Sequence, residues 1–225
     1  MNKWDLDFDE MCRKLRDVEN FSFCRFGDGE WSCVLGRNGM NCDKHRYLLE
    51  LSLSLAFVLL QPQRFYCGMQ PKGMRDLGDD IKRWIVSNEC ELEWCNADII
   101  HDASIEGRLG ELWTAARRRK KILVGPNHLK PIANKYGCGY VFVPDRNCFK
   151  WRTTIEADIG EELAHAGKDA VILYCASMLT EVLIDSIHTA YGDTLTQIDA
   201  GSALDPYVGV NSRRYHKQII ERLGK

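Results

Sequence analysis

The sequence has no apolar run long enough to cross a membrane. Its most apolar stretch, YLLELSLSLAFVLL at residues 47–60, contains Glu50 and is shorter than the roughly 20 residues that a membrane-spanning helix needs. A buried helix is therefore expected there. The first ten residues, MNKWDLDFDE, are acidic and lack the apolar core of a signal peptide. We expect a protein without membrane insertion, located in the cytoplasm of a cell or of an infected host.

The chain also carries little net charge and has no closely spaced cysteine pairs. The formal net charge is -2, so no overall positive field favours nucleic acid or an anionic membrane. Ten cysteines are many for 225 residues, yet no two of them have the two-residue spacing of a zinc knuckle. Several lie inside apolar segments, such as Cys24, Cys67 and Cys175. This placement favours buried free thiols in a reducing compartment.

Repeats, low-complexity tracts and linkers rich in proline or serine are absent, so we expect one domain over residues 1–225. Strands are expected where short apolar segments are rich in β-branched and aromatic residues, at 21–26, 64–68, 120–124, 140–143, 170–175 and 195–199. Helical patterns occur at 6–18, 30–36, 44–60, 73–87, 106–118, 128–136, 153–166, 178–190 and 211–223. This alternation predicts a Rossmann-like α/β fold, with a mostly parallel sheet and helices on both faces. The segment 88–105 has the weakest periodicity, and we expect an insertion or a loop with short helices there.

Polar, glycine-rich segments follow several of the expected strands. In a parallel sheet, ligands bind beyond the carboxyl ends of the strands. We therefore expect one site at one edge of the sheet. The segments expected to form it are RFGDGEW (25–31), VGPNH (124–128), YCASM (174–178) and IDAGSALDPY (198–207).

The segment RFGDGEW places two carboxylates, Asp28 and Glu30, on either side of a single glycine. In an extended or turn conformation both side chains can point the same way, and their oxygens suit Mg²⁺ or Mn²⁺. Gly27 would let the backbone approach a ligand closely, and Arg25 could pair with a carboxylate or a phosphate. The pattern also fits a plain helix start, with Asp28 as the N-cap and Glu30 in the first turn. Neither a G-x-G-x-x-G fingerprint nor a Walker A lysine accompanies it.

These residues resemble the signature of the GT-D-type glycosyltransferases, a family first described as a domain of unknown function. RFGDGEW matches the family's Asp-x-Glu motif. The segments KILVGPNHLKPIA (121–133), AVILYCASMLTEVLI (170–184) and QIDAGSALDPYVGVNSRRY (197–215) are similar to its later blocks. The resemblance implies a GT-D-like fold in which Asp28 and Glu30 bind a divalent metal together with the diphosphate of a nucleotide sugar. Family members carry a histidine in the last block, where this chain has Ser202.

The resemblance further implies transfer of a hexose from a nucleotide sugar, with a UDP-sugar as the expected donor and Mn²⁺ or Mg²⁺ as the metal. The acceptor is expected to be a hydroxyl group on a glycan or glycoprotein. A carboxylate or a histidine can act as the base for that hydroxyl, and we expect Asp205 or His128 in this role. The residues expected around the donor are Arg25, Gly27, Asn127, Ser177, Asp199, Ser202 and Arg213.

Several of these residues also have a plain structural interpretation. Asn127 is a good N-cap for the expected helix at 128–136, and a lone histidine such as His128 is more often structural. Asp205 precedes a proline and suits a turn, and Arg213 is expected on the surface of the last helix.

Other functions are compatible with the same sequence. The basic run RRRKK (117–121) and the cations and aromatics that alternate up to residue 152 would suit a viral enzyme that glycosylates a hydroxymethylated DNA base. A non-enzymatic nucleotide-binding protein could use the same loops. Paired carboxylates also serve metal-dependent phosphohydrolases.

Overall fold

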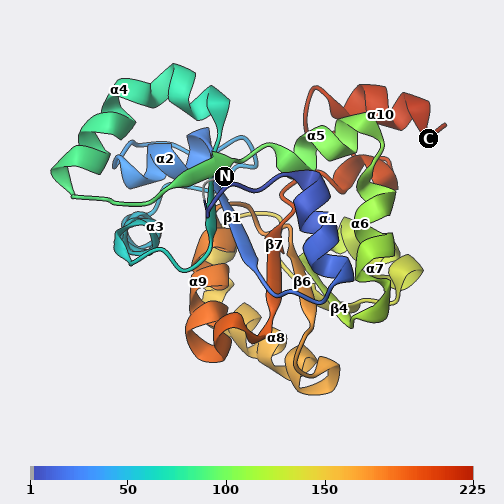
Figure 1. Ribbon diagram of the computed structural model, residues 1–225. Coiled ribbons are helices and arrows are strands. Elements are labelled where there is room, and N and C mark those ends of the chain that lie inside the picture. The colour runs from blue at the N-terminus through green and yellow to red at the C-terminus, as the bar shows by residue number, and fades with distance from the viewer. Residues whose placement is uncertain (1–2, 225) are drawn as a thin grey trace.

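The computed structural model describes residues 3–224 of the chain. These residues form an α/β fold around a seven-stranded sheet whose strands all run parallel (Figure 1). The strand order is β3-β2-β1-β7-β6-β4-β5. The strands are β1 (Ser22–Phe26), β2 (Tyr66–Met69), β3 (Trp94–Asn96), β4 (Lys121–Gly125), β5 (Gly139–Phe142), β6 (Val171–Tyr174) and β7 (Thr196–Asp199). The helices are α1 (Phe8–Arg16), α2 (Asp28–Val34), α3 (Leu49–Leu60), α4 (Pro71–Ser87), α5 (Ile99–Glu106), α6 (Leu109–Ala115), α7 (Lys130–Tyr136), α8 (Arg152–Ala166), α9 (Thr180–Tyr191) and α10 (His216–Arg222).

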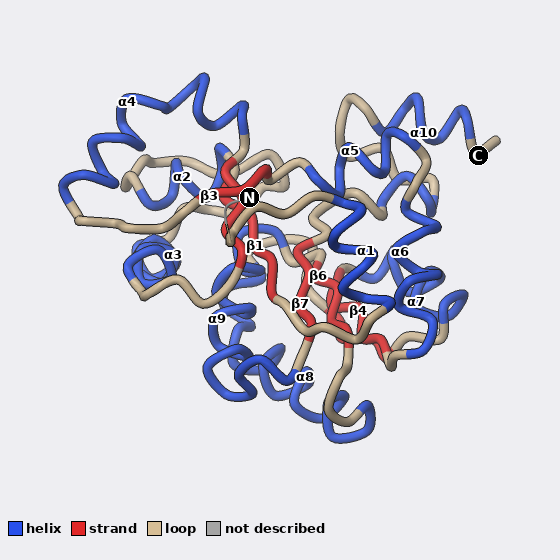
Figure 2. The backbone as a smooth tube through the Cα atoms, viewed as in Figure 1, coloured by secondary structure: helices blue, strands red, loops and turns tan. Residues whose placement is uncertain are grey.

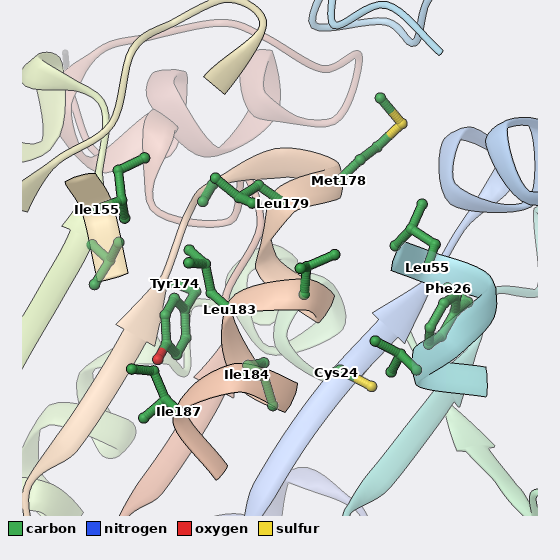
Figure 3. Close-up of a cluster of buried hydrophobic side chains, with 14 of the residues drawn as sticks. Cys24, Phe26, Leu55, Ile155, Tyr174, Met178, Leu179, Leu183, Ile184 and Ile187 are labelled. Atoms are coloured by element: carbon green, nitrogen blue, oxygen red, sulfur yellow. The ribbon is translucent and has the colours of Figure 1, made fainter. Parts of the chain in front are cut away.

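Helices cover both faces of the sheet, and each face has its own apolar core (Figure 2). Successive side chains of a strand point to opposite faces, so each central strand supplies both cores. In β1, Phe23 joins the core beneath α1, α5, α6 and α7, whereas Cys24 joins the core beneath α2, α3, α4, α8 and α9. Figure 3 shows part of the second core, where Leu183 of α9 lies near Tyr174 of β6. The predicted Rossmann-like α/β fold is confirmed.

The segment 88–105, where we expected an insertion or a loop with short helices, contains β3 and most of α5. Strand β3 pairs in parallel with β2 and forms one edge of the sheet. Three residues are too few for an alternating pattern to be visible in the sequence. The helix expected at 106–118 is also interrupted, because α5 ends at Glu106 and Gly107 adopts the left-handed conformation with φ 82°.

Helix α3 is shorter and more exposed than the apolar run at 47–60 predicted. The helix begins at Leu49, and Leu49, Leu53 and Phe57 are 71%, 61% and 57% exposed. The other side of α3, with Leu51 and Leu55, reaches the core. The prediction of a buried helix is therefore wrong for one of its two sides. Within residues 3–224, no helix combines the length and apolar character needed to span a membrane.

All ten cysteines are free, and most of them are buried. Burial raises the pKa of the Cys33 and Cys95 thiols to about 12, so neither forms a reactive thiolate near neutral pH. Cys24, Cys67 and Cys175, which the sequence singled out, are all free and buried, so the prediction of buried free thiols is confirmed for them.

The close approach of β2 to Ala97 gives a first test of the fold. A Cβ atom at Gly68 would lie 2.7 Å from the Cα atom of Ala97, so the backbone would have to shift. We expect Gly68→Ala to lower the free energy of unfolding by about 1–3 kcal/mol in urea denaturation. Gly110→Ala on α6 is the matched control, since a Cβ there meets nothing within 4 Å and alanine favours the helix. Equal stability of both variants would contradict the packing of this sheet edge.

Candidate functional site

A cleft of about 430 Å³ lies beyond the carboxyl ends of the strands. Segments that follow each strand of the sheet contribute to its lining, and parallel α/β folds bind ligands at this edge. Ten of the residues singled out by their sequence pattern line the cleft. They are Arg25, Gly27, Asp28, Glu30, His128, Ser177, Asp199, Ser202, Asp205 and Arg213.

Asn127 is not among the residues that line the cleft, and it is exposed. The expectation that it caps a helix at 128–136 is wrong, because α7 begins at Lys130 and Asn127 begins a short 3-10 helix, η2 (Asn127–Leu129). Pro131 has no N–H group to donate to the carbonyl of Asn127, so α-helical bonding cannot include that turn. Arg213 likewise precedes α10, although we expected it on the last helix.

Asp28 and Glu30 both lie in the first turn of α2, not in an extended segment. Gly27 is the N-cap, and its N–H group donates a hydrogen bond to Oε2 of Glu30 at 2.9 Å. Asp28 is partly exposed and pairs with Nζ of Lys72 on α4 at 2.6 Å. The helix-start interpretation therefore holds for Glu30 but not for Asp28 as the cap, and both carboxylates still line the cleft.

Two glutamates bring to the cleft carboxyl groups that have no cationic partner within residues 3–224. Glu181, from the first turn of α9, is 1% exposed, and its Oε2 atom has no hydrogen-bond partner among the described residues. Burial, together with the carboxylates of Glu30 and Asp199, holds the pKa of Glu181 well above its usual range. Burial and the nearby Asp199 also raise the pKa of Glu30 to about 7. These carboxyl groups therefore favour a proton, a cation or a hydrogen-bond donor as a partner.

Arg25 and Asp199 pair across the neighbouring strands β1 and β7. Nε and Nη2 of Arg25 donate to Oδ2 and Oδ1 of Asp199 at 2.9 and 3.1 Å. Nη1 of Arg25 lies 3.1 Å from Nε2 of His101 on α5. All three guanidinium nitrogens thus contact protein groups. This geometry indicates that Arg25 holds Asp199 in place, so Arg25 pairs with a carboxylate, one of the two partners that its sequence position suggested.

His128 and Asp205 form a hydrogen-bonded pair on the β4 side of the cleft. Nε2 of His128 lies 2.9 Å from Oδ1 of Asp205, and Oγ of Ser212 donates to the second oxygen of Asp205. The hydrogen bond with Asp205 raises the pKa of His128. Asp205 is buried and both of its oxygens are occupied, whereas the His128 side chain is 32% exposed. Of the two candidate bases, His128 is therefore the one that can meet an acceptor.

The connection between α2 and α3, residues 35–48, is hydrogen-bonded to segments that follow β6 and β7. Arg213 donates to both carboxylate oxygens of Asp43 at 2.8 Å each. Nδ2 of Asn41 donates to Oγ of Ser177 at 2.8 Å. Ser177 and Arg213, which we expected beside the donor, hold this connection in the structure and also line the cleft.

The cleft is strongly acidic. Within the described part of the chain, its lining contains seven carboxylates and two arginines, Arg25 and Arg213, which are both paired with carboxylates. A ligand that carries phosphate groups would be repelled there unless it binds together with a cation.

Asp28 and Glu30 fit a cation that is shared with a ligand. Carboxylate oxygens are ligands of Mg²⁺ and Mn²⁺, and phosphate and water oxygens commonly complete the shell. Across residues 3–224, no group of three or more His, Cys, Asp or Glu side chains is placed to hold a metal ion. The residues therefore suit a site completed by a diphosphate and not a closed metal site made by the protein alone.

The basic run RRRKK lies away from the cleft. It joins the 3-10 helix η1 (Ala116–Arg118) to the amino end of β4, whereas the cleft lies beyond the carboxyl ends of the strands. Arg119 is buried and donates to the carbonyl of Asp169 and to the hydroxyl of Thr196. Arg119 therefore ties together the starts of neighbouring strands and does not form part of an acceptor surface at the cleft.

Glu181 and His101 are cleft residues that the sequence pattern did not indicate. Both lie on helices, where a polar residue is ordinarily expected at the surface. A single charge inside the apolar run MLTEVLI was the available signal for Glu181. Ser202 occupies the sequence position at which GT-D family members carry a histidine, and it lines the cleft. His101 and His128 bring imidazole groups to the same cleft.

Solved structures of glycosyltransferases share this fold. One is described as a new glycosyltransferase, of domain of unknown function 1792, from Streptococcus sanguinis. It superposes with a TM-score of 0.68 at 17% identity, over 90% of this chain and 82% of that chain. Another is described as showing that the highly conserved domain of unknown function 1792 has a distinct glycosyltransferase fold. Its TM-score is 0.63 at 17% identity, over 90% of this chain and 79% of that chain. At this identity the likeness establishes the fold, and it confirms the GT-D-like architecture that the resemblance implied. No family model and no curated protein sequence matches the chain.

Breaking the Arg25–Asp199 pair tests whether it supports the cleft. Asp199→Asn leaves the charge of Arg25 without its partner in a buried setting, and we expect a loss of about 3–5 kcal/mol in the free energy of unfolding. Asp28→Asn removes the exposed pair with Lys72 and is the matched control, with an expected cost below about 1 kcal/mol. Urea denaturation measures both. Similar small losses in the two variants would show that the buried pair does not support the fold.

Proposed function

We propose that the protein is a metal-dependent glycosyltransferase that moves a hexose from a nucleotide sugar, with a UDP-sugar as donor, to a hydroxyl group of a glycan or glycoprotein. One observation carries the proposal. On a fold shared with glycosyltransferase structures, a single cleft contains both the Asp28 and Glu30 carboxylates and the His128–Asp205 pair. The carboxylates suit a cation and a diphosphate, and the pair suits removal of a proton from a hydroxyl group.

On the donor side, transfer breaks the bond between the anomeric carbon and a diphosphate oxygen. Negative charge then builds up on the leaving diphosphate. Asp28 and Glu30 would hold a Mg²⁺ or Mn²⁺ ion, which would offset this charge. Lys72, which pairs with Asp28, adds positive charge beside the same position. The strongly acidic lining supports metal dependence, because a diphosphate without a cation would be repelled.

On the acceptor side, the hydroxyl oxygen bonds to the anomeric carbon and its proton passes to His128. Nε2 of His128 is bonded to Asp205, which leaves Nδ1 as the nitrogen that takes the proton. Asp205, itself held by Ser212, orients the ring and stabilises the imidazolium that forms. Proton transfer is thus assigned to His128, and orientation of its ring to Asp205.

The distribution of charge favours a glycan or glycoprotein acceptor over DNA. The phosphates of DNA would face an acidic cleft, and the basic run RRRKK lies at the opposite edge of the sheet. The formal net charge of -2 gives no compensating attraction. A neutral acceptor with hydroxyl groups meets none of this repulsion.

Metal-dependent nucleotide binding tests the donor half of the proposal. Asp28→Asn and Glu30→Gln each remove an oxygen ligand, and we expect each to weaken binding of a nucleoside diphosphate in Mn²⁺ by about tenfold or more in calorimetry. Asp80→Asn is the control, because Asp80 pairs with Arg37 and Arg83 and does not line the cleft. Unchanged binding in both cleft variants would remove Asp28 and Glu30 from the donor site.

The pH dependence of kcat/KM tests the acceptor half. His128 must be neutral to take a proton, so activity should fall as the pH drops through its pKa, which the Asp205 hydrogen bond raises. Asp205→Asn removes this effect, and we expect the acid limb of the profile to move to lower pH together with a lower maximum rate. His128→Ala should reduce kcat by about 10²–10⁴-fold. An acid limb that does not move in Asp205→Asn would assign it to another group.

A further inference from the structure

Glu181 is a residue of the cleft to which the proposed function gives no role. It is the second residue of α9, it is 1% exposed, and it lines the cleft. Its Oε2 atom has no hydrogen-bond partner among the described residues. A buried polar atom without a partner is costly for a folded protein. In a ligand cleft, such an atom points to a group that the ligand supplies.

Packing of α9 holds Glu181 in this position. Leu183, Ile184 and Ile187 of the same helix belong to the buried core together with Tyr174 of β6, as Figure 3 shows. Helix α9 cannot turn its first residues towards solvent without disrupting that core. The carboxyl group is therefore already in place before a ligand binds, which lowers the entropic cost of binding.

The neighbours of Glu181 argue against a phosphate group as its partner. Glu30 and Asp199 line the same cleft as Glu181, and Arg25 is already paired with Asp199. A phosphate would add further negative charge to this group. A hydroxyl group of a sugar is neutral and can donate a hydrogen bond to a carboxyl oxygen.

The strand order places Glu181 between the residues proposed to bind the diphosphate and the residue proposed to take the acceptor's proton. Asp28 and Glu30 follow β1 and His128 follows β4, while β7 and β6 lie between those strands. Glu181 follows β6 through the 3-10 helix η4 (Ser177–Leu179). A sugar that leaves a diphosphate near β1 and joins an acceptor near His128 must lie over the ends of β7 and β6.

We propose that the carboxyl group of Glu181 binds a hydroxyl group of the transferred sugar and thereby selects the donor. This inference rests on the proposed function and names a residue that determines its sugar specificity. Glu181 contacts the substrate but takes no part in bond breaking or proton transfer.

Calorimetric titrations in Mn²⁺ test the inference with three proteins: the wild type, Glu181→Ala, and Glu161→Ala as a control on the exposed side of α8. The probes are UDP, GDP, a panel of their sugar derivatives, and analogues of the preferred donor that each lack one sugar hydroxyl. We expect the wild type to prefer the complete sugar over one deoxy analogue by about tenfold. Glu181→Ala removes the acceptor oxygens and should lose about tenfold in affinity for the complete donor, while its affinity for the free nucleoside diphosphate changes less than about twofold.

Glu181→Ala should bind the complete donor and that deoxy analogue equally, whereas Glu161→Ala should behave as the wild type. Thermal unfolding checks that the variant is folded, and Glu181→Asp, which shortens the side chain, is the second variant with the same expected loss of discrimination. Equal loss of affinity for UDP and UDP-sugar, weaker binding of Mn²⁺ alone, or unchanged discrimination between the sugars would overturn the assignment. A wild-type protein that binds no nucleoside diphosphate in Mn²⁺ would overturn the proposed function itself and, with it, this inference.

Discussion

The pairing of Arg25 with Asp199 is the interaction on which the cleft depends. It joins β1 to β7 at the centre of the sheet, directly below the segments that carry Asp28, Glu30 and Ser202. Arg25 pairs with Asp199 and contacts His101 with its remaining nitrogen, so it does not form an ion pair with Glu30 or Glu181. The acidic character of the site is consistent with this arrangement, and it is the basis on which we propose a ligand that binds together with a metal ion.

That acidity determines which ligands suit each part of the cleft. Near β1, the partly exposed Asp28 and its neighbour Glu30 suit a cation and a diphosphate. Deeper in, the buried Glu181 suits a neutral hydrogen-bond donor. Near β4, His128 faces the cleft with Asp205 behind it. A nucleotide sugar with its metal, followed by an acceptor hydroxyl, meets these requirements in the order in which the strands present them.

Much of this arrangement could be predicted from the sequence, since alternation of apolar strands with helices defines a parallel sheet and brings the carboxyl ends of all strands to one edge. The same reasoning predicts that Asp28, Asp199 and Asp205 lie at one edge of the sheet, and all three line the cleft. Local sequence patterns were less informative where tertiary packing or a single residue determines the bounds of a helix or strand. Three residues of β3 show no period, and Pro131 delays the start of α7 beyond Asn127. The single charge of Glu181 inside the apolar run MLTEVLI marks an unusual position, but only the fold shows that this position faces a cleft.

Release of nucleoside diphosphate from a panel of nucleotide sugars, with Mn²⁺ and with a chelator, is the measurement that tests the central claim most directly. A glycosyltransferase with this cleft should slowly transfer its sugar to water, so free nucleoside diphosphate should appear from one donor in Mn²⁺ and stop when the metal is removed. Release that continues unchanged in the chelator would contradict metal dependence. No release from any donor, together with no metal-dependent binding of a nucleoside diphosphate, would contradict the assignment of this cleft to a sugar donor.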